Sequence, residues 1–191
     1  CSSSAKVFAQ AARLIQAGVV DAALVGGVDT LCGSVLFGFN ALQLVSKQPC
    51  RPFDAARDGL SLGEAGGFVV LERSDAGGEA ALQLLGYGES SDAHHMSAPH
   101  PQGLGAQLAM RDALARAGIS AADVGYLIVE SVIALLALEQ GLLPGTLNST
   151  TPDPTCGPQI RFDNRKQAIR YAMNNSFGFG GNNASLVFGR A

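Results

Sequence analysis

The chain has 191 residues, of which 47% are hydrophobic and 15% are charged, and its formal net charge is −3 at pH 7. This apolar content is enough to fill a core, so the composition excludes an intrinsically disordered chain. No basic cluster interrupts the slightly acidic composition, so we expect no nucleic-acid partner.

The longest apolar run extends only from Val132 to Leu138, whereas a membrane-spanning helix needs ~20 apolar residues. We therefore expect no membrane partner. The four cysteines, at positions 1, 32, 50 and 156, are far apart and lack the close spacing of metal ligands. Scattered thiols of this kind are typical of a reducing compartment, so the sequence predicts a cytoplasmic protein without a metal site.

The chain starts with Cys1 and three serines rather than with methionine. A mature bacterial lipoprotein also begins with cysteine and small residues, and that alternative stays open. A lipoprotein would continue as a flexible tether, whereas the residues after Ser4 enter a helical pattern at once. We favour a piece of a longer polypeptide, in which the region before Cys1 is missing.

Residues 2–17 have helical periodicity, with Phe8, Ile15 and Val19 on the apolar face and serine hydroxyls available to cap the start. Cys1 stands at the beginning of this helix, beside unpaired backbone N–H groups and the positive end of the helix dipole. Both features favour the thiolate, which is the form that nucleophilic catalysis requires. The alternative is an inert, buried cysteine.

The rest of the chain alternates between strand and helix patterns, which predicts an α/β protein. A glycine-rich linker is expected at Gly77 and Gly78. Strands are expected at residues 22–28, 68–72, 81–87, 124–127 and 184–188, and helices at residues 35–45, 105–117, 120–123 and 130–139.

A loop at residues 90–99 carries His94 and His95, and His100 follows just beyond it. Three nearby histidines raise the alternative of a metal site. Adjacent side chains diverge, however, and no cysteine or second carboxylate completes a ligand set. We therefore expect no metal in this loop.

Residues 173–183 contain three glycines within four positions and two phenylalanines, Phe177 and Phe179, spaced by one glycine. Because glycine visits left-handed conformations and permits close approach, we predict that this stretch is neither strand nor helix. Bulky rings on a glycine hinge suggest a gate over a pocket. The alternative is a tight turn whose aromatic rings pack into the core.

Three stretches resemble one family. Asn-Ser-Phe-Gly-Phe-Gly-Gly-Asn-Asn at residues 175–183 closely resembles the C-terminal signature of the β-ketoacyl-acyl-carrier-protein synthases, the elongating condensing enzymes of fatty-acid and polyketide synthesis. Cys-Ser-Ser-Ser-Ala at residues 1–5 resembles the head of that family's nucleophile helix, and Arg-Pro-Phe-Asp at residues 51–54 resembles a further signature. The resemblance implies a thiolase-like, layered α/β/α fold with mixed sheets, here incomplete.

By resemblance, residues 1–72 form the end of the N-terminal half and residues 73–191 the C-terminal half, with an apparent gap near residues 127–130. The family's Asn-x-His-Gly-Thr and Ser-Thr-Lys…Gly-His motifs, which carry two catalytic histidines and a lysine, are absent there. Consecutive α-carbons lie ~3.8 Å apart, so a strand end and a distant helix start should not meet across two residues. We therefore expect a chain break between Tyr126 and Ser131.

The resemblance also implies the catalytic roles. Cys1 would be the nucleophile that accepts the acyl group. The backbone N–H groups of Cys1 and Phe179 would form an oxyanion hole. Phe177 and Phe179 would shield the site, and Phe39 would bound the acyl pocket.

Two loops would form the gate that the resemblance implies. Gly178, Gly180 and Gly181 would let the gate swing. Asp92 and His95 would link it to the second mobile loop.

The implied reaction is the decarboxylative Claisen condensation of an acyl thioester, held on Cys1, with malonyl-acyl-carrier-protein. No metal or organic cofactor is implied, because phosphopantetheine arrives on the carrier protein. The implied partners are the acyl carrier protein, acyl and malonyl thioesters, and a second subunit in a homodimer or a ketosynthase-type heterodimer. Three alternatives stay open: a catalytically silent partner subunit of the chain-length-factor type, a fragment without condensing activity, and an acyltransferase that uses Cys1 without decarboxylation.

Overall fold

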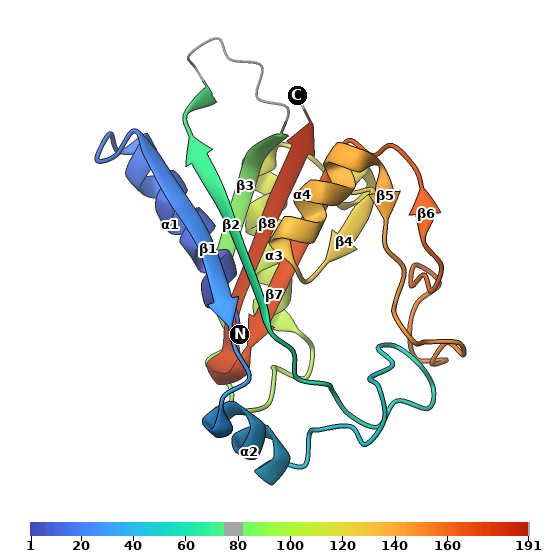
Figure 1. Ribbon diagram of the computed structural model, residues 1–191. Helices are drawn as coiled ribbons and strands as arrows, with labels where there is room; N and C mark the ends of the chain where they lie inside the picture. Colours follow the sequence, from blue (N-terminus) through green and yellow to red (C-terminus); the bar gives the residue numbers. More distant parts are fainter. Residues whose placement is uncertain (75–81, 191) are drawn as a thin grey trace. The chain divides into compact units, whose positions relative to one another are not determined.

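The computed structural model describes residues 1–74 and 82–190 (Figure 1). It divides into two compact units. The sheet unit comprises Cys1–Gly27, Gly67–Gly141 and Gln167–Ala191, and the loop unit comprises Val28–Gly66 and Leu142–Lys166. The expected linker at Gly77 and Gly78 lies outside the described residues. The two expected halves, residues 1–72 and 73–191, come from the family resemblance, whereas the two units are compact regions of the structure. The expected halves stay a prediction.

Helices and strands alternate along much of the chain, which confirms the α/β class. The elements in chain order are α1 (Ser3–Gln16), β1 (Ala22–Asp29), α2 (Gly33–Ala41), β2 (Ala65–Glu72), β3 (Leu82–Ser91), α3 (Leu104–Ala117), η2 (Ala121–Asp123), β4 (Tyr126–Ile128), α4 (Ser131–Gln140), β5 (Leu142–Leu143), β6 (Arg165–Lys166), β7 (Tyr171–Gly178), η3 (Phe179–Gly181) and β8 (Asn182–Arg190).

A four-stranded mixed sheet forms the centre of the sheet unit, in the order β3-β8-β7-β4. β8 pairs antiparallel with both β3 and β7, and β7 pairs parallel with β4. β8 is buried over seven consecutive residues, because helices cover both faces of this sheet. The predicted buried strand at residues 184–188 is therefore confirmed, and it extends further at both ends.

The two faces of β8 contact different helices, because successive strand residues point to opposite faces. Val187 packs in one cluster with Met173 of β7 and Ala113 of α3. On the other face, the ring of Phe188 meets Phe8 of α1 edge to face, with ring centroids 5.7 Å apart. Such an aromatic pair adds about 0.5–1.5 kcal/mol beyond the area that it buries.

A two-stranded sheet of β1 and β2 covers α1 and α4 on the side away from β8. A β-carbon on Gly27 would lie 2.9 Å from Ser4 Cβ of α1, and one on Gly67 would lie 2.8 Å from Val132 Cγ2 of α4. The sheet unit is therefore layered as α3, the mixed sheet, α1 with α4, and the β1–β2 sheet (Figure 1).

Several boundaries and burial patterns differ from the sequence prediction. Ser2 is the N-cap of α1 but makes no capping side-chain hydrogen bond to any described residue. Val19 is 66% exposed, because the chain leaves the helix at Gly18, which has a φ of 69°. The strand at residues 22–28 forms as predicted but is not buried throughout, since Leu24 faces away from the helices and is exposed.

The prediction that residues 173–183 exclude a strand is wrong. Residues 173–178 belong to β7, and only Phe179–Gly181 forms the turn. Asn174 pairs with both β4 and β8 and Asn175 pairs with β8, and these backbone hydrogen bonds override the low strand propensity of the two asparagines. The side chain of Asn175 accepts a hydrogen bond from Ser185 Oγ at 2.7 Å, so its burial leaves that acceptor satisfied.

The backbone passes from Tyr126 to Ser131 without interruption, and the gap that the resemblance implies here stays a prediction. β4 ends at Ile128 and α4 begins at Ser131 on a continuous backbone. The side chain of Glu130 caps α4 by accepting a hydrogen bond from the N–H of Val132 at 3.2 Å. A long excursion whose two ends lie close together can be absent without moving its flanks, and two-residue strand-to-helix loops are common.

The loop unit contains α2, which starts and ends earlier than the predicted helix at residues 35–45. Every residue of α2 is exposed or partly exposed. β5 and β6 form a short antiparallel pair that the sequence analysis did not predict. Across both units, no helix within the described residues has the length and apolar character needed to cross a bilayer.

Packing between α3 and β3 yields a stability prediction. A methyl group on Gly88 would stand 2.8 Å from Asp112 Cβ and would also overlap the carbonyl of Ala109. We expect Gly88→Ala to destabilise the sheet unit by about 1–3 kcal/mol, measured by urea unfolding. Gly63→Ala is the control, because none of the described residues comes within 4 Å of its methyl position. Equal stability of the two variants would contradict this packing.

Candidate active site

Cys1 lies directly against Gly178 at the end of β7. A β-carbon on Gly178 would stand 2.9 Å from Cys1 Cβ and 3.4 Å from the backbone nitrogen of Ser2. The N-terminus and the turn between β7 and β8 thus meet at one end of the sheet unit (Figure 1). The structure brings together the predicted nucleophile and the predicted gate, which come from opposite ends of the sequence.

The start of α1 fixes the position of Cys1. Ser2 is 3% exposed, and its carbonyl accepts a hydrogen bond from the N–H of Lys6 at 3.0 Å. Cys1 therefore stands one residue ahead of the N-cap, and its side chain is exposed. A helix N-terminus favours negative charge, so this position suits a thiolate nucleophile.

The turn between β7 and β8 depends on two of its three glycines for its backbone conformation. Gly180 and Gly181 have φ angles of 78° and 71°, in the left-handed region that favours glycine. The rings on either side of Gly178 are accessible, since Phe177 is 43% exposed and Phe179 is 47% exposed. Neither ring is packed into the core, which argues against the alternative of a core-aromatic turn.

Phe177 and Gly178 are neighbours on β7, so their side-chain directions point to opposite faces of the sheet. Since Gly178 faces Cys1, Phe177 points away from it. The shielding role of Phe177 and the oxyanion hole formed by the N–H groups of Cys1 and Phe179 stay predictions.

Asp92 joins the loop after β3 to the β7–β8 turn. Its backbone N–H donates to the carbonyl of Gly181 at 2.9 Å. Its carboxylate accepts hydrogen bonds from the N–H of His100 at 2.8 Å and from Asn183 Nδ2 at 2.7 Å. The N–H of His100 and then the Asn183 amide lower the pKa of Asp92, so the carboxylate is held in its charged form.

The described hydrogen bonds of His95 are local, and its role in linking the loop to the gate stays a prediction. Its Nδ1 accepts hydrogen bonds from the backbone N–H groups of Ser97 and Ala98 at 3.1 and 3.2 Å. The direct link from this loop to the turn is made by Met96, whose carbonyl accepts from the N–H of Gly180 at 2.7 Å. The contribution of Met96 is a backbone contact, so no side-chain pattern in the sequence could reveal it.

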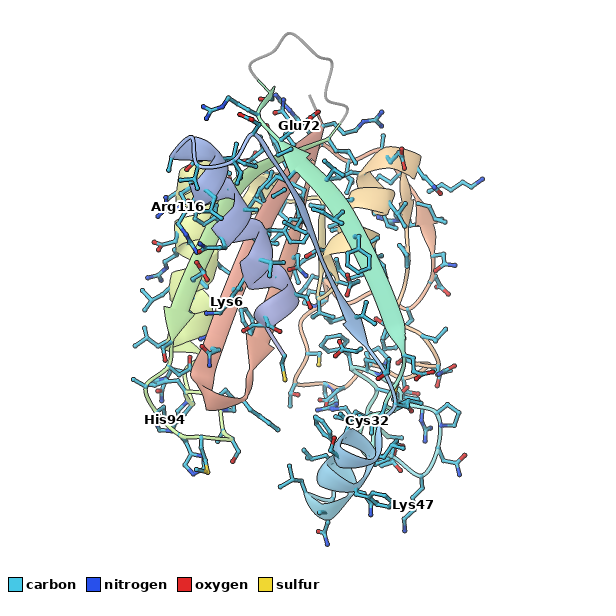
Figure 2. The ribbon with its side chains drawn as sticks, turned by 60° about the vertical axis from the view of Figure 1, so that its left-hand side comes forward. Lys6, Cys32, Lys47, Glu72, His94 and Arg116 are labelled. Atoms are coloured by element: carbon cyan, nitrogen blue, oxygen red, sulfur yellow. The ribbon has the colours of Figure 1, made fainter. Side chains whose placement is uncertain are left out.

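The other two histidines of this region, His94 and His100, contact each other. The rings of His94 and His100 meet edge to face, with centroids 5.3 Å apart, and Figure 2 labels His94 at this end of the sheet unit. Within residues 1–74 and 82–190, no three side chains of histidine, cysteine, aspartate or glutamate gather in a way that could hold a metal ion.

A polar strip on β7, next to the junction of β4 and α4, was missed by the sequence analysis. Asn174 is fully buried and its Nδ2 lies 3.5 Å from the carbonyl oxygen of Ile128. Ser176 Oγ lies 3.5 Å from the carbonyl oxygen of Val129. Asn174, Ser176 and Gly178 alternate along β7 and therefore share the face on which Cys1 lies.

The Arg-Pro-Phe-Asp motif has a structural function in the loop unit. Asp54 is 2% exposed, and its carboxylate accepts hydrogen bonds from the N–H groups of Thr150, Thr151 and Ala56 at 2.8–2.9 Å. These donors, with Thr151 the strongest, lower the pKa of Asp54 to about 2. Arg57 forms an ion pair with Asp153 on the same pair of loops.

Cys32 is a second exposed thiol at a helix N-terminus. It is the N-cap of α2, and its Sγ lies 3.1 Å from Ser34 Oγ (Figure 2). This hydroxyl, and then the N–H of Val35, lower the pKa of Cys32. Phe39, the predicted wall of the acyl pocket, lies on the same helix and is partly buried. Its role in an acyl pocket stays a prediction.

The comparisons with known proteins point to one family. Residues 1–76 match the model of the β-ketoacyl synthase N-terminal domain, and residues 82–131 match that of the C-terminal domain. The chain belongs to the β-ketoacyl synthase family. It is 33% identical to 3-oxoacyl-[acyl-carrier-protein] synthase 2 of Rhizobium meliloti, an alignment that covers 100% of this chain and 59% of the relative.

Solved structures of β-ketoacyl synthases share the fold. One chain of the complex between a ketosynthase and its chain length factor from Xenorhabdus doucetiae is 33% identical, with a TM-score of 0.92 over 100% of this chain and 58% of that chain. A β-ketoacyl synthase from Burkholderia phymatum is 26% identical, with a TM-score of 0.90 over 100% of this chain and 60% of that chain. The expected thiolase-like layered fold is confirmed, as part of the complete fold.

The chain spans about three fifths of the length of these synthases. The alignment with the Rhizobium synthase runs over 248 positions, although this chain has 191 residues, so that relative carries residues with no counterpart here. The match to the C-terminal-domain model ends at residue 131, the first residue of α4. This is also where the expected histidine and lysine motifs are absent from the sequence.

Acid should weaken the loop unit. The pKa values of Asp54 and Asp153 are lowered from 3.8 to about 2, for Asp153 by the hydroxyl and N–H of Thr155 and then by Arg57. Groups with a depressed pKa stabilise the fold above their unfolded pKa, and this stabilisation is lost as the pH falls towards about 2. We expect the urea midpoint to fall on acidification, and to fall less steeply in Asp54→Asn. Asp163→Asn is the charge-matched control, and identical profiles for the two variants would contradict the assignment.

The thiols should separate into two classes. Cys1 and Cys32 are exposed, whereas Cys50 and Cys156 are partly buried. We expect iodoacetamide at pH 7 to label Cys1 and Cys32 about ten times faster than the other two, as measured by peptide mapping. Earlier labelling of Cys50 or Cys156 would contradict this order. Cys1 and Cys32 would compete for the reagent, and Cys32→Ser removes that competition.

Proposed function

We propose that the protein to which this chain belongs is a β-ketoacyl-acyl-carrier-protein synthase in fatty-acid or polyketide synthesis. One observation carries the proposal: an exposed cysteine at the start of α1 lies against the glycine that precedes Phe179. Membership of the family indicates the class of reaction. This contact indicates that the reaction starts at Cys1.

The first half-reaction is acyl transfer to Cys1. The thiolate attacks the carbonyl carbon of an acyl thioester, a new carbon–sulfur bond forms, and the carrier thiolate leaves and takes up the proton that Cys1 lost. N–H donors aimed at the developing oxyanion lower this barrier, and the N–H groups of Cys1 and Phe179 are the proposed donors. Loss of one such donor costs about 10²–10³-fold in rate.

The second half-reaction joins the acyl group to malonyl-acyl-carrier-protein. Loss of carbon dioxide from the malonyl group leaves an enolate, whose carbon attacks the acyl carbonyl on Cys1 and frees the Cys1 thiolate. The family stabilises this enolate with two histidines supported by a lysine. The motifs that carry them have no match in this sequence, and His94, His95 and His100 lie in a different loop.

That difference favours a second candidate, in which the chain belongs to a silent partner subunit. The direct join of β4 to α4 is the supporting observation, because it replaces the segment that would carry decarboxylation. The similar chain from Xenorhabdus doucetiae comes from a complex of a ketosynthase with its chain length factor, so a paired arrangement of this kind is known for a similar protein. The presence of Cys1 favours the synthase, since the chain-length-factor type replaces the nucleophile.

The proposed synthase works with an acyl carrier protein, takes acyl and malonyl thioesters, and pairs with a second subunit, identical or of the ketosynthase type. We place it in the cytoplasm. The only prosthetic group in the proposed reaction is the phosphopantetheine of the carrier protein.

A mass measurement separates these functions. The protein is incubated with an acyl-N-acetylcysteamine thioester and its intact mass is recorded. We expect one acyl adduct on Cys1, absent from Cys1→Ala and retained in Cys32→Ser. Adding malonyl-acyl-carrier-protein then tests condensation: release of carbon dioxide with loss of the adduct supports the synthase. An adduct that persists supports acyl transfer without decarboxylation, and no adduct supports the silent partner.

A further inference from the structure

Gly178 has no backbone reason to be glycine. Its φ and ψ are −128° and 163°, which is ordinary extended strand that any residue adopts. It pairs with Asn182 as the last residue of the β7–β8 ladder. Gly180 and Gly181 differ in this respect, because their left-handed φ angles require glycine. Gly178 is therefore not one of the residues on which the bend of the turn depends.

What Gly178 supplies is space for the nucleophile. The β-carbon that it lacks would lie 2.9 Å from Cys1 Cβ, 3.5 Å from Cys1 Cα and 3.4 Å from Ser2 N. Carbon atoms in contact normally lie about 3.5–4.0 Å apart, so the closest of these contacts requires Cys1 to move. By contrast, the nearest described atom to a methyl on Gly180 is Asn182 Nδ2, at 3.4 Å.

The strand residue Gly178 and the helix residue Ser2 are both held in place, so the displacement would fall on Cys1 between them. Gly178 is fixed by the pairing of β7 with β8. Ser2 is buried and starts the hydrogen bonding of α1. Cys1 is exposed and is the part that can yield.

We propose that Gly178 is a positioning residue for the nucleophile, whose missing side chain keeps the Cys1 thiol against the turn that presents Phe179. The catalytic consequence rests on the proposed function of Cys1 as the acyl acceptor, whereas the steric contact does not. A displacement of about 1 Å at a reacting group can cost about 10²-fold in rate. We therefore expect Gly178→Ala to slow acyl transfer by about that factor.

The kinetic test compares two reagents on the same thiol. Gly178→Ala should slow acylation of Cys1 by an acyl-N-acetylcysteamine thioester about 100-fold. Iodoacetamide needs no oxyanion hole and no fixed approach, so its rate with Cys1 should fall less than about threefold. Labelling of Cys32, which lies in the other unit, reports the integrity of the sample. Equal slowing with both reagents would overturn the positioning role, and so would unchanged acylation.

The second test is a double-mutant cycle on stability. Cys1→Gly removes the β-carbon that a methyl on Gly178 would meet, so it should relieve the cost of Gly178→Ala. We expect the urea midpoint to fall in Gly178→Ala and to recover in Cys1→Gly/Gly178→Ala relative to Cys1→Gly alone. Gly180→Ala is the control, since its cost comes from the backbone angle and should be the same in both backgrounds.

The double-mutant cycle also gives an answer if one of the variants fails to fold. A Gly178→Ala protein that folds only together with Cys1→Gly supports the proposal, and one that is unfolded in both backgrounds overturns it. An equal fall in midpoint in both backgrounds also overturns it. If the parent protein takes up no acyl group, the proposed function fails, and the cycle still decides whether Gly178 and Cys1 are in steric contact.

Discussion

The pairing of β8 with β7 on one side and β3 on the other is the constraint on which the candidate site depends. The β7 pairing ends at Gly178 and Asn182, which sets where the turn begins. The β3 pairing ends at Ser91 and Asn182, which delivers Asp92 beside the carbonyl of Gly181. α1 packs its Phe8 ring on Phe188 of the same strand. One central strand therefore positions the nucleophile helix, the turn and the second loop.

Much of the layered fold could be predicted from periodicity. The face of α1 that carries Phe8 and Ile15 is buried, and the glycine at position 18 ends that helix. The strand predicted at residues 184–188 is there and buried. Periodicity could not predict that Leu24 and Phe68 are exposed. The sequence pattern of an apolar strand is the same whether or not a further layer of the protein covers it.

The candidate site was less predictable, for two physical reasons. Asn174 and Asn175 have low strand propensity, yet pairing with the neighbouring strands outweighs it, and their side chains face opposite sides of the sheet. The hydrogen bond from the N–H of Gly180 to the carbonyl of Met96 joins two backbone groups. Because nearly every residue has these groups, the sequence cannot reveal this bond. The meeting of Cys1 with residues 175–183 was expected only through family resemblance, since nothing in local pattern relates the two ends of a chain.

The two-residue join between β4 and α4 has a consequence for how chemistry is distributed along such a fold. The strand keeps its parallel partner and the helix keeps its cap, although the residues between them number only two, Val129 and Glu130. By the resemblance seen in the sequence, the expected histidine and lysine motifs belong between these same two elements. A segment inserted at this join would leave and re-enter the fold at one place, so the pairing of β4 with β7 and the contact of Cys1 with Gly178 do not depend on it.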